Sequence, residues 1–377
     1  MNGAPKNEAA WLVAKHAPLQ VKDAPNTEPG AGEILVRNHA VAVNPVDWML
    51  QYVGGLAFGW IKYPFVLGSD LAGEVVAVGS GVTEVKVGDR VLAMAAGSVK
   101  QRNRASEGAF QAYSIVLERL TTVIPDRLSY VDAAVVPLGV TTAACGLFQS
   151  DLLALALPTA NAKTRDQWVI VWGGSTSVGG NAIQLAVAAG YGVIATASPK
   201  NFDYVTSLGA AHVFDYNSPD VVRDIIAALR GKALAGALAI GSGSVLVLLD
   251  ILPHCEGRRL IANCSADISF DALPKGPRIT LPVLAKLLVA RLRGAAETRR
   301  KSRRHGITAK FFDASSVVDN EIGPAIYRDY LGPALAEGRF RPAPPARVVG
   351  HGLGAIQTAF DIQRAGVSAV KVVVTLN

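Results

Sequence analysis

The stretch Val169–Gly190, "VIVWGGSTSVGGNAIQLAVAAG", decides the fold of the central part of the chain. It begins as an apolar, β-branched run, passes through a turn of glycines and hydroxyl residues, and continues as small and apolar residues up to a glycine. This pattern predicts a buried strand, a tight turn and a helix. Because backbone N–H groups converge at the start of such a helix, the turn is a candidate site for a pyrophosphate.

The turn itself departs from the usual dinucleotide fingerprint. Gly173–Gly180 reads "GGSTSVGG", so hydroxyl residues stand where one glycine of G-x-G-x-x-G would be. An ordinary strand-to-helix turn has a similar sequence, and the turn alone therefore leaves both interpretations open.

The segment about two dozen residues further on favours the nucleotide interpretation and a particular cofactor. In dinucleotide-binding domains, the residue that binds the adenosine ribose lies at about this distance along the chain and is an acid. This sequence has no acid there and instead has Ser198, Pro199, Lys200 and Asn201. An acid would repel a 2′-phosphate, whereas a lysine with a hydroxyl neighbour attracts one. The cofactor predicted is NADPH and not NADH; the alternative for Lys200 is a solvent-exposed residue in the first turn of a helix.

Strand and helix patterns alternate through the rest of this region. Strands are predicted at 191–198, 211–216, 233–240 and 258–265, and helices at 199–210, at 218–231 and between the last two strands. This alternation is typical of a parallel, doubly wound sheet.

The flanking regions differ. Short alternating strands separated by glycine-rich turns, at 32–44, 71–82 and 87–94, predict an antiparallel barrel over about 33–123. After the central region come a helix at 323–338, a Pro-rich link at 341–346, a helix at 352–366 and a strand at 369–376.

Length and composition set the broad class. A chain of 377 residues, half of them apolar, is long enough for two domains with cores. Its start does not read as a leader, and the apolar stretch Gly236–Leu252 is interrupted by glycines, serines and Asp250, so we expect a cytoplasmic protein without a membrane span. Three cysteines, Cys145, Cys255 and Cys264, fit neither a disulfide framework nor a zinc motif.

The positive charge is local. Arg291–His305 carries seven Lys or Arg and one Glu, a net +6 of the chain's total +7. The simplest interpretation is a solvated loop or helix face. No aromatic platform or nucleic-acid module accompanies the charge, so we expect no nucleic-acid partner. The functional alternative is attraction of a phosphorylated substrate or an acidic carrier protein.

Five segments of the sequence resemble those of a known protein family. They are "NPVDW" (Asn44–Trp48), "YPFVLGSDLAGEVVAVGSGVTEVKVGDRV" (Tyr63–Val91), "PLGVTTAA" (Pro137–Ala144), "GGSTSVGGNAIQLA" (Gly173–Ala186) and "SPKNFDYVTSLGA" (Ser198–Ala210). Together they resemble the zinc-independent medium-chain dehydrogenase/reductases, and within them the trans-acting enoyl reductases of fungal polyketide pathways.

The resemblance implies an α/β protein of two domains. A GroES-like β-barrel catalytic domain would comprise residues 1–138 and 319–377. A Rossmann domain, with a doubly wound parallel sheet that binds NADPH, would comprise residues 139–318. The active site would lie between the two.

The zinc branch of the superfamily provides a contrast. Its members carry a cysteine near the "NPVDW" position, Gly-His-Glu where this chain has Gly68, Ser69 and Asp70, and a four-cysteine loop soon after Val91. None of these is present in the sequence. We therefore expect no metal and no zinc-type alcohol dehydrogenation.

The resemblance also implies the residues of the site. Asn44, Thr141 and Thr142 are the predicted catalytic residues. The predicted cofactor-binding residues are Val46, Asp47, Trp48, Met49, Ser175, Thr176, Ser177, Val178, Ser198, Pro199, Lys200, Asn201, Tyr216, Asn263, Cys264, Val367 and Ser368. Structural alternatives remain: a helix cap for Thr141 and Thr142, a turn residue for Asn44, and a surface aromatic for Tyr216.

One position departs from the family. Related enoyl reductases often have a lysine directly after "NPVDW", where this chain has Met49. If that lysine orients the substrate or supplies a proton in the family, this chain must use another donor, a water or a different chemistry.

The sequence thus predicts an NADPH-dependent, metal-free reductase of the C=C bond in a polyketide-type α,β-unsaturated thioester or ketone. The substrate would be a small molecule or an acyl group on a carrier, with a polyketide synthase as possible partner and a monomer or homodimer as the state. The alternatives are a quinone-oxidoreductase-like reductase of free enones or quinones, and an NADPH-binding auxiliary protein of low turnover, which Met49 keeps open.

Overall fold

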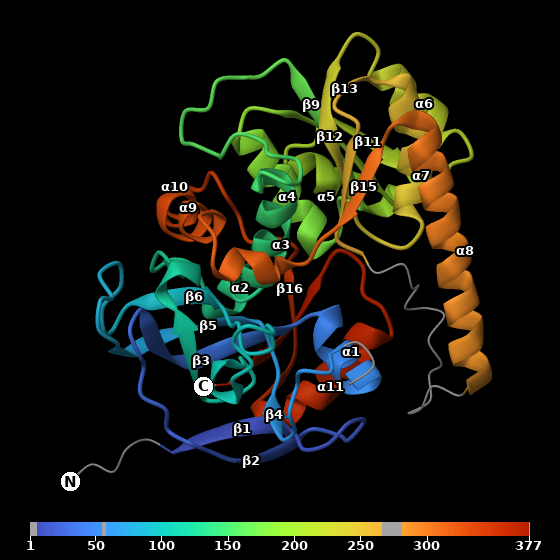
Figure 1. Cartoon of the computed structure of the whole chain (residues 1–377). Helices are drawn as coiled ribbons and strands as arrows, with labels where there is room; N and C mark the ends of the chain where they lie inside the picture. Colours follow the sequence, from blue (N-terminus) through green and yellow to red (C-terminus); the bar gives the residue numbers. More distant parts are fainter. Residues whose placement is uncertain (1–5, 55–57, 266–280, 377) are drawn as a thin grey trace. The chain divides into compact units, whose positions relative to one another are not determined.

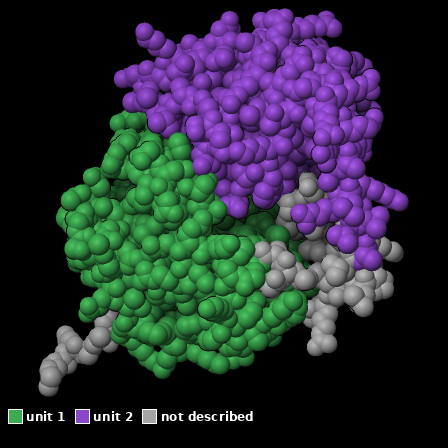
Figure 2. Space-filling model, in the orientation of Figure 1, with its two compact units in different colours: residues 1–141, 315–377 green, residues 142–314 purple. Residues whose placement is uncertain are grey.

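The computed structural model describes residues 6–54, 58–265 and 281–376. These form two compact units (Figure 2). Unit 1 consists of Met1–Thr141 and Ser315–Asn377, and unit 2 of Thr142–Ala314. The helix α3 (Pro137–Phe148) contains the division between them.

Unit 2 is built on a parallel sheet with the strand order β11-β10-β9-β12-β14-β15, and β13 pairs with β12. The strands are β9 (Gln167–Trp172), β10 (Gly192–Ala197), β11 (His212–Asp215), β12 (Ala233–Ala239), β13 (Glu256–Gly257), β14 (Leu260–Asn263) and β15 (Thr308–Phe311). The apolar run at Val169 forms β9, whose last four residues are buried. Central parallel strands are covered on both faces, which explains why they read as continuous apolar runs.

The strand order reverses beside β9. The chain passes outward from β9 to β10 and β11, and then returns to β12 on the other side of β9. The helices of this unit are α4 (Ser177–Ala188), α5 (Phe202–Ser207), α6 (Val221–Ala228), α7 (Ser244–Ile251) and α8 (Leu281–His305) (Figure 1). In open α/β sheets, ligands bind at the carboxyl ends of the strands next to such a reversal. The predicted doubly wound Rossmann sheet is confirmed.

Unit 1 contains two mainly antiparallel sheets. The larger has the order β16-β17-β3-β5-β6-β8 with β7 beside β3, and the smaller has the order β2-β1-β4. Their strands are β1 (Asn7–Leu12), β2 (Gln20–Ala24), β3 (Glu33–Val43), β4 (Phe65–Val66), β5 (Asp70–Val78), β6 (Arg90–Met94), β7 (Tyr113–Leu117), β8 (Thr121–Val123), β16 (Ala346–His351) and β17 (Lys371–Thr375). Two register shifts between β3 and β5 add local twist, as bulges do, which suits a barrel-like sheet. The predicted GroES-like barrel is confirmed.

The helices of unit 1 lie before and after the sheet strands in the chain. They are α1 (Pro45–Val53), α2 (Tyr130–Ala133), α9 (Ile322–Ile326), α10 (Gly332–Glu337) and α11 (Ile356–Arg364). The single helix predicted at 323–338 is interrupted by a π-helical turn, Tyr327–Leu331. Pro333 lies two residues after this turn and lacks the N–H that would continue the α-helical ladder, which accounts for the interruption.

Several short strands were absent from the sequence prediction. They are β1, β2, β4, β7, β8, β13, β15 and β16. β15 and β16 have mostly part-exposed or exposed residues, because each lies at the edge of its sheet, and a strand of this kind carries no apolar run to reveal it.

Within residues 6–54, 58–265 and 281–376, one helical stretch has the length and apolarity of a membrane span. It is Tyr130–Phe148, and 83% of its apolar window is buried inside the structure. The two helices of this stretch, α2 and α3, are therefore mostly buried inside the protein.

Candidate functional site

The glycine-rich turn after β9 is held by its own threonine. Thr176 caps α4: its Oγ1 accepts the Gly179 N–H at 3.0 Å and donates to the Gly173 carbonyl at 2.8 Å. Gly173 has φ of 90°, a left-handed conformation that favours glycine. The hydroxyl that replaces a fingerprint glycine is therefore a helix cap, and sequence reasoning had assigned it only to phosphate contact.

Ser177, at the first position of α4, is different. Its hydroxyl oxygen is buried and has no hydrogen-bond partner among the described residues. A buried unpaired hydroxyl at a helix N-terminus is suited to an anionic oxygen, because the N–H groups of the first turn and the helix dipole favour negative charge there. Ser175 and Val178 are half-exposed on either side.

The predicted 2′-phosphate residues lie at the ends of two neighbouring strands. Ala197 of β10 pairs with Asp215 of β11, so Ser198 and Tyr216 follow the same edge of the sheet. Lys200 and Tyr216 are exposed, whereas Asn201 is buried and donates its amide to Ser198 Oγ at 3.1 Å. A cation, a hydroxyl and a phenol are thus available at this edge, and Asn201 orients the hydroxyl. Pro199 starts the short helical turn between them.

Asn263 and Cys264 come at the end of β14, at the same edge. Asn263 is buried and its Oδ1 accepts the Ser265 N–H at 3.0 Å. Cys264 Sγ lies 3.6 Å from the Ala239 carbonyl oxygen. The predicted cofactor residues of unit 2 are therefore gathered at the carboxyl ends of β9, β10, β11 and β14.

In unit 1, Asn44 begins α1 and belongs to a buried charged group. Its Nδ2 donates to Asp70 Oδ2 at 2.8 Å, and its Oδ1 accepts from Lys371 Nζ at 2.5 Å. Lys371 Nζ also lies 2.9 Å from Asp70 Oδ2, and the two side chains are only 5% and 0% exposed. We call Asn44, Asp70 and Lys371 the buried triad. The side chain of the predicted catalytic Asn44 is thus engaged inside unit 1.

The buried triad also reaches α3. Asp70 Oδ1 accepts the Leu138 N–H at 2.5 Å, at the N-terminus of that helix. One carboxylate therefore connects the start of α1 with the start of α3, the two helices that carry Asn44–Met49 and Thr141.

Thr141 is buried and its hydroxyl is occupied. Its Oγ1 donates to the Pro137 carbonyl at 2.8 Å and lies 2.8 Å from the Tyr327 hydroxyl, which donates to the same carbonyl at 3.0 Å. Burial raises the pKa of the Tyr327 phenol well above its usual range. The next residue, Thr142, is half-exposed.

The remaining predicted residues of unit 1 fall into two groups. Val46 and Met49 are half-exposed on α1, while Trp48 is buried and its Nε1 donates to Gln363. Val367 and Ser368 lie on the loop that leads into Lys371, half-exposed and exposed respectively.

Asp47 carries a strongly perturbed carboxyl group. It is 1% exposed, its Oδ2 accepts the Asn44 N–H at 2.8 Å, and its Oδ1 has no partner within the described residues. Burial raises the pKa of Asp47 from 3.8 to about 7; Asp70 adds to the rise, and the Asn44 N–H and Lys371 oppose it.

This pKa predicts how stability depends on pH. The folded state binds the Asp47 proton more tightly than the unfolded state, so the stabilisation is complete below about pH 4 and is lost as pH rises to about 7. The side chain of Asp47→Asn cannot ionise. We therefore expect the free energy of unfolding of this variant to rise, relative to that of the parent, by at most about 1.4 kcal/mol per pH unit within this window. Urea unfolding of both proteins from about pH 5 to 8 measures this, and parallel curves would contradict it.

Sequence reasoning missed Asp70, Lys371 and Tyr327 as partners of the predicted site. One signal was available for Lys371, which is a lone cation in the apolar strand "AVKVVVTL". A lysine is seldom fully buried unless it is paired.

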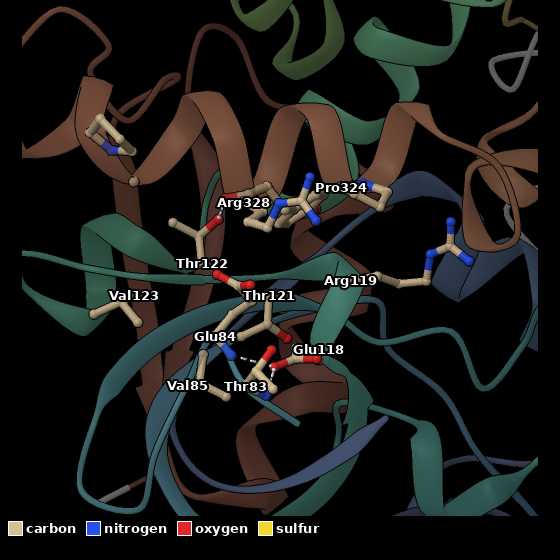
Figure 3. Close-up of a pocket in the computed structure, with 13 residues that line it drawn as sticks. Thr83, Glu84, Val85, Glu118, Arg119, Thr121, Thr122, Val123, Pro324 and Arg328 are labelled. Atoms are coloured by element: carbon tan, nitrogen blue, oxygen red, sulfur yellow. Dashed lines mark hydrogen bonds between the residues drawn. The ribbon is translucent and has the colours of Figure 1, made fainter. Parts of the chain in front are cut away.

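A cavity of about 410 Å³ in unit 1 is lined by Tyr327, the partner of Thr141, together with residues of β8, α10 and the loop at Thr83 (Figure 3). None of the predicted site residues lines it. At its wall, Glu118 Oε1 accepts the N–H groups of Thr83 and Glu84 at 2.7 and 2.6 Å. The Glu118 carboxylate therefore holds the loop that contains Thr83 and Glu84.

No metal-binding cluster is found in the part of the chain that the structure describes, in the sense of three or more neighbouring His, Cys, Asp or Glu.

Comparisons with known proteins agree with this architecture. Residues 30–126 match the family described as "Alcohol dehydrogenase GroES-like domain". The chain is 51% identical to "Dehydrogenase pigH" of Monascus ruber, over 99% of this chain and all of that protein. It is 35% identical to "Trans-enoyl reductase himH" of Aspergillus japonicus, over 98% of both chains. Among solved structures, the CurK enoyl reductase superposes with a TM-score of 0.71 at 18% identity, over 99% of this chain and all of that one.

Proposed function

Because the chain belongs to the medium-chain dehydrogenase/reductase superfamily and is thus an oxidoreductase, we propose that it is an NADPH-dependent, metal-free enoyl reductase. The reaction would transfer a hydride to the C=C bond of a polyketide-type α,β-unsaturated thioester or ketone. The observation that carries this proposal is the set of groups at the carboxyl edge of the unit 2 sheet, above all the unpartnered Ser177 hydroxyl at the start of α4. A trans-enoyl reductase among the relatives supports the substrate class.

The residues at this edge fit a phosphorylated nicotinamide dinucleotide. Ser177 and the first N–H groups of α4 would hold the pyrophosphate, with Ser175 and Val178 beside them. Lys200, Ser198 and Tyr216 would hold the 2′-phosphate. Bound there, NADPH would supply the hydride.

The proton must come from another source. Met49 has no exchangeable proton, Lys371 is paired with Asp70, and the phenol of Tyr327 is buried against Thr141. We therefore assign the protonation of the α-carbon to water.

The role of the buried triad is positioning. The Asp70 carboxylate accepts hydrogen bonds from Asn44 and from the start of α3, so it holds both in place. Lys371 balances the charge of Asp70. Asp70 stands at the third position of the motif that is Gly-His-Glu in zinc enzymes, and Ser69 replaces the histidine. With Asp70 bound to Lys371 and no cysteine or histidine beside it, the donors do not suit zinc.

The proposal extends to the setting of the enzyme. The substrate would be a small molecule or an acyl group on a carrier, supplied by a polyketide synthase, and the protein would act in the cytoplasm as a monomer or homodimer.

The purified protein can be tested with NADPH, crotonyl N-acetylcysteamine and a panel of quinones, with and without a chelator. We expect oxidation of NADPH with the thioester that chelation leaves unchanged. Turnover with quinones alone would instead assign the protein to quinone reduction. Tight NADPH binding without turnover would assign it to an auxiliary role, as Met49 suggests.

Cofactor choice gives a separate prediction. We expect NADPH to bind at least about tenfold more tightly than NADH, about 1.4 kcal/mol, and Lys200→Ala to remove most of this difference. The reason is that the exposed Lys200 ammonium would contact only the 2′-phosphate. Calorimetry of both cofactors measures this, with Lys163→Ala as a control lysine of the same unit; equal dissociation constants in the parent would contradict it.

A further inference from the structure

The basic segment of the sequence is the C-terminal half of α8. The helix packs on unit 2 through a half-buried face made by Thr298, Ser302 and His305. Lys301 reinforces this contact, since its Nζ lies 2.7 Å from Asp250 Oδ1 of α7. The remaining residues of Arg291–Arg304 are exposed, apart from Gly294 and Lys301.

This exposed face has two chemical halves. Leu288, Leu292, Arg299 and Arg303 are spaced at i, i+4, i+11 and i+15, so they form one line along the helix about 22 Å long. Leu288 and Leu292 are 55% and 61% exposed, which is unusual for two neighbouring leucines. The line is thus apolar in its first half and cationic in its second. We call it the α8 stripe.

Lys301 apart, the described fold does not use the cations of the C-terminal half of α8. Six arginines carry its charge, and none has a side-chain ion pair or hydrogen bond to any described residue: Arg291, Arg293, Arg299, Arg300, Arg303 and Arg304. Arg299 and Arg303 are four residues apart, as are Arg300 and Arg304, and like charges at that spacing destabilise a helix. The helix dipole offsets this only in the last turn. The repulsion between these arginines therefore lowers the stability of α8 in the protein without a partner.

We propose that the α8 stripe docks an acidic protein domain, the carrier that bears the substrate as a thioester. This inference rests on the proposed function and adds the docking surface. Arginine guanidinium groups bind carboxylates in pairs of hydrogen bonds, and the adjoining leucines offer an apolar contact that a partner can bury. Such a surface matches an acidic helix with an apolar residue at one end.

Other occupants fit this surface less well. A second copy of the chain would bring its own six arginines against these. A nucleic acid would need aromatic side chains for stacking, and Leu281–His305 contains no Phe, Tyr or Trp. A helix that lies in a membrane surface keeps its apolar face along its whole length, whereas the second half of this line is arginine.

The test compares two variants of equal charge. In the stripe variant, the stripe arginines Arg299 and Arg303 and the adjacent Arg300 and Arg304 are replaced by Gln. In the control variant, four exposed cations on other elements are replaced by Gln: Lys22, Lys100, Arg230 and Arg347. Each protein is assayed with crotonyl groups on an excised polyketide-synthase carrier domain and on N-acetylcysteamine, at low and high salt. Calorimetry measures binding of the carrier domain independently of turnover.

We expect the stripe variant to lose about tenfold in kcat/KM and in affinity for the carrier domain at low salt, and to keep its rate with the small thioester. The loss should shrink at high salt, because the screening length at ~0.15 M is only about 8 Å. The control variant should match the parent with both substrates.

The outcomes separate the two proposals. Equal carrier binding by parent and stripe variant overturns the docking surface and leaves the proposed function intact. Failure of every protein to reduce either thioester overturns the proposed function, while the calorimetric loss would still support docking. Sedimentation of the parent, but not the stripe variant, with phosphatidylserine vesicles, together with no carrier binding, assigns the surface to membranes and overturns the proposal.

Discussion

Lys371→Met should destabilise unit 1 by about 3–5 kcal/mol, because it leaves Asp70 as a fully buried carboxylate without a cation. Methionine nearly preserves the length of the side chain, so the effect reports the lost charge and hydrogen bonds and not a cavity. Asn44 Oδ1 also loses its donor. A buried acceptor left unpaired adds its own cost.

Hydrogen exchange measured by mass spectrometry suits this prediction. The chain has two units, and peptides from β17 and α1 report unit 1 while peptides from β9 and β12 serve as an internal reference. Exchange should accelerate in the first set only. The double variant Lys371→Met/Asp70→Asn, which removes both charges, should recover at least about 1.5 kcal/mol of the loss, since residues in one network couple by up to about 3 kcal/mol.

An exposed ion pair provides the matched control. Lys310 Nζ lies 2.5 Å from Asp151 Oδ2, but these side chains are 43% and 61% exposed. Lys310→Met should therefore cost less than about 1 kcal/mol. If the two lysine variants lose equal stability, the burial of the triad has no energetic consequence.

The triad also marks a limit of sequence reasoning. Asn44, Asp70 and Lys371 lie on three separate elements, and 301 positions separate Asp70 from Lys371. The local sequence around Asp70 or Lys371 does not predict that the two residues are partners. Their contact exists only after β17 has paired with β3 and β3 with β5. The lone lysine in an apolar strand signals that a partner exists and does not identify it.

Where structure is decided locally, the sequence was sufficient. The apolar run before Gly173 and the small residues after it predict a strand, a turn and a helix, and the structure has β9, the turn and α4 in these places. The parallel sheet of unit 2 was predictable for the same reason: its central strands are buried on both faces and read as unbroken apolar runs. The edge strands β15 and β16 contain no such apolar run, so the sequence did not predict them.

The function of hydroxyl residues was harder to predict. Thr176 caps a helix, and Thr141 bonds back to the carbonyl four residues before it. Threonine serves equally as cap, back-bonding residue or ligand, and its sequence context does not separate these roles. The unpaired hydroxyl of Ser177 was distinguishable from its neighbours only once the hydrogen bonds of the turn were known.

Gly179→Ala should abolish the nucleotide site proposed at the start of α4. A methyl group at Gly179 would lie 2.2 Å from the Gly173 carbonyl oxygen and 2.8 Å from Gly174 Cα. Both obstacles are backbone atoms, so the turn itself must move, and the Gly179 N–H would be drawn away from Thr176 Oγ1. The groups that converge on the pyrophosphate would no longer converge.

We expect Gly179→Ala to weaken NADPH binding by at least about a hundredfold, or about 2.7 kcal/mol, in calorimetry. Gly294→Ala is the matched control: it also lies in a helix of unit 2, but a methyl group there meets nothing within 4 Å. That variant should leave NADPH binding unchanged and stabilise α8 by about 0.5–1 kcal/mol, because alanine restricts the unfolded chain more than glycine does. Circular dichroism of both variants separates lost binding from lost folding. A folded Gly179→Ala protein that binds NADPH as the parent does would show that the turn before α4 is not the phosphate site.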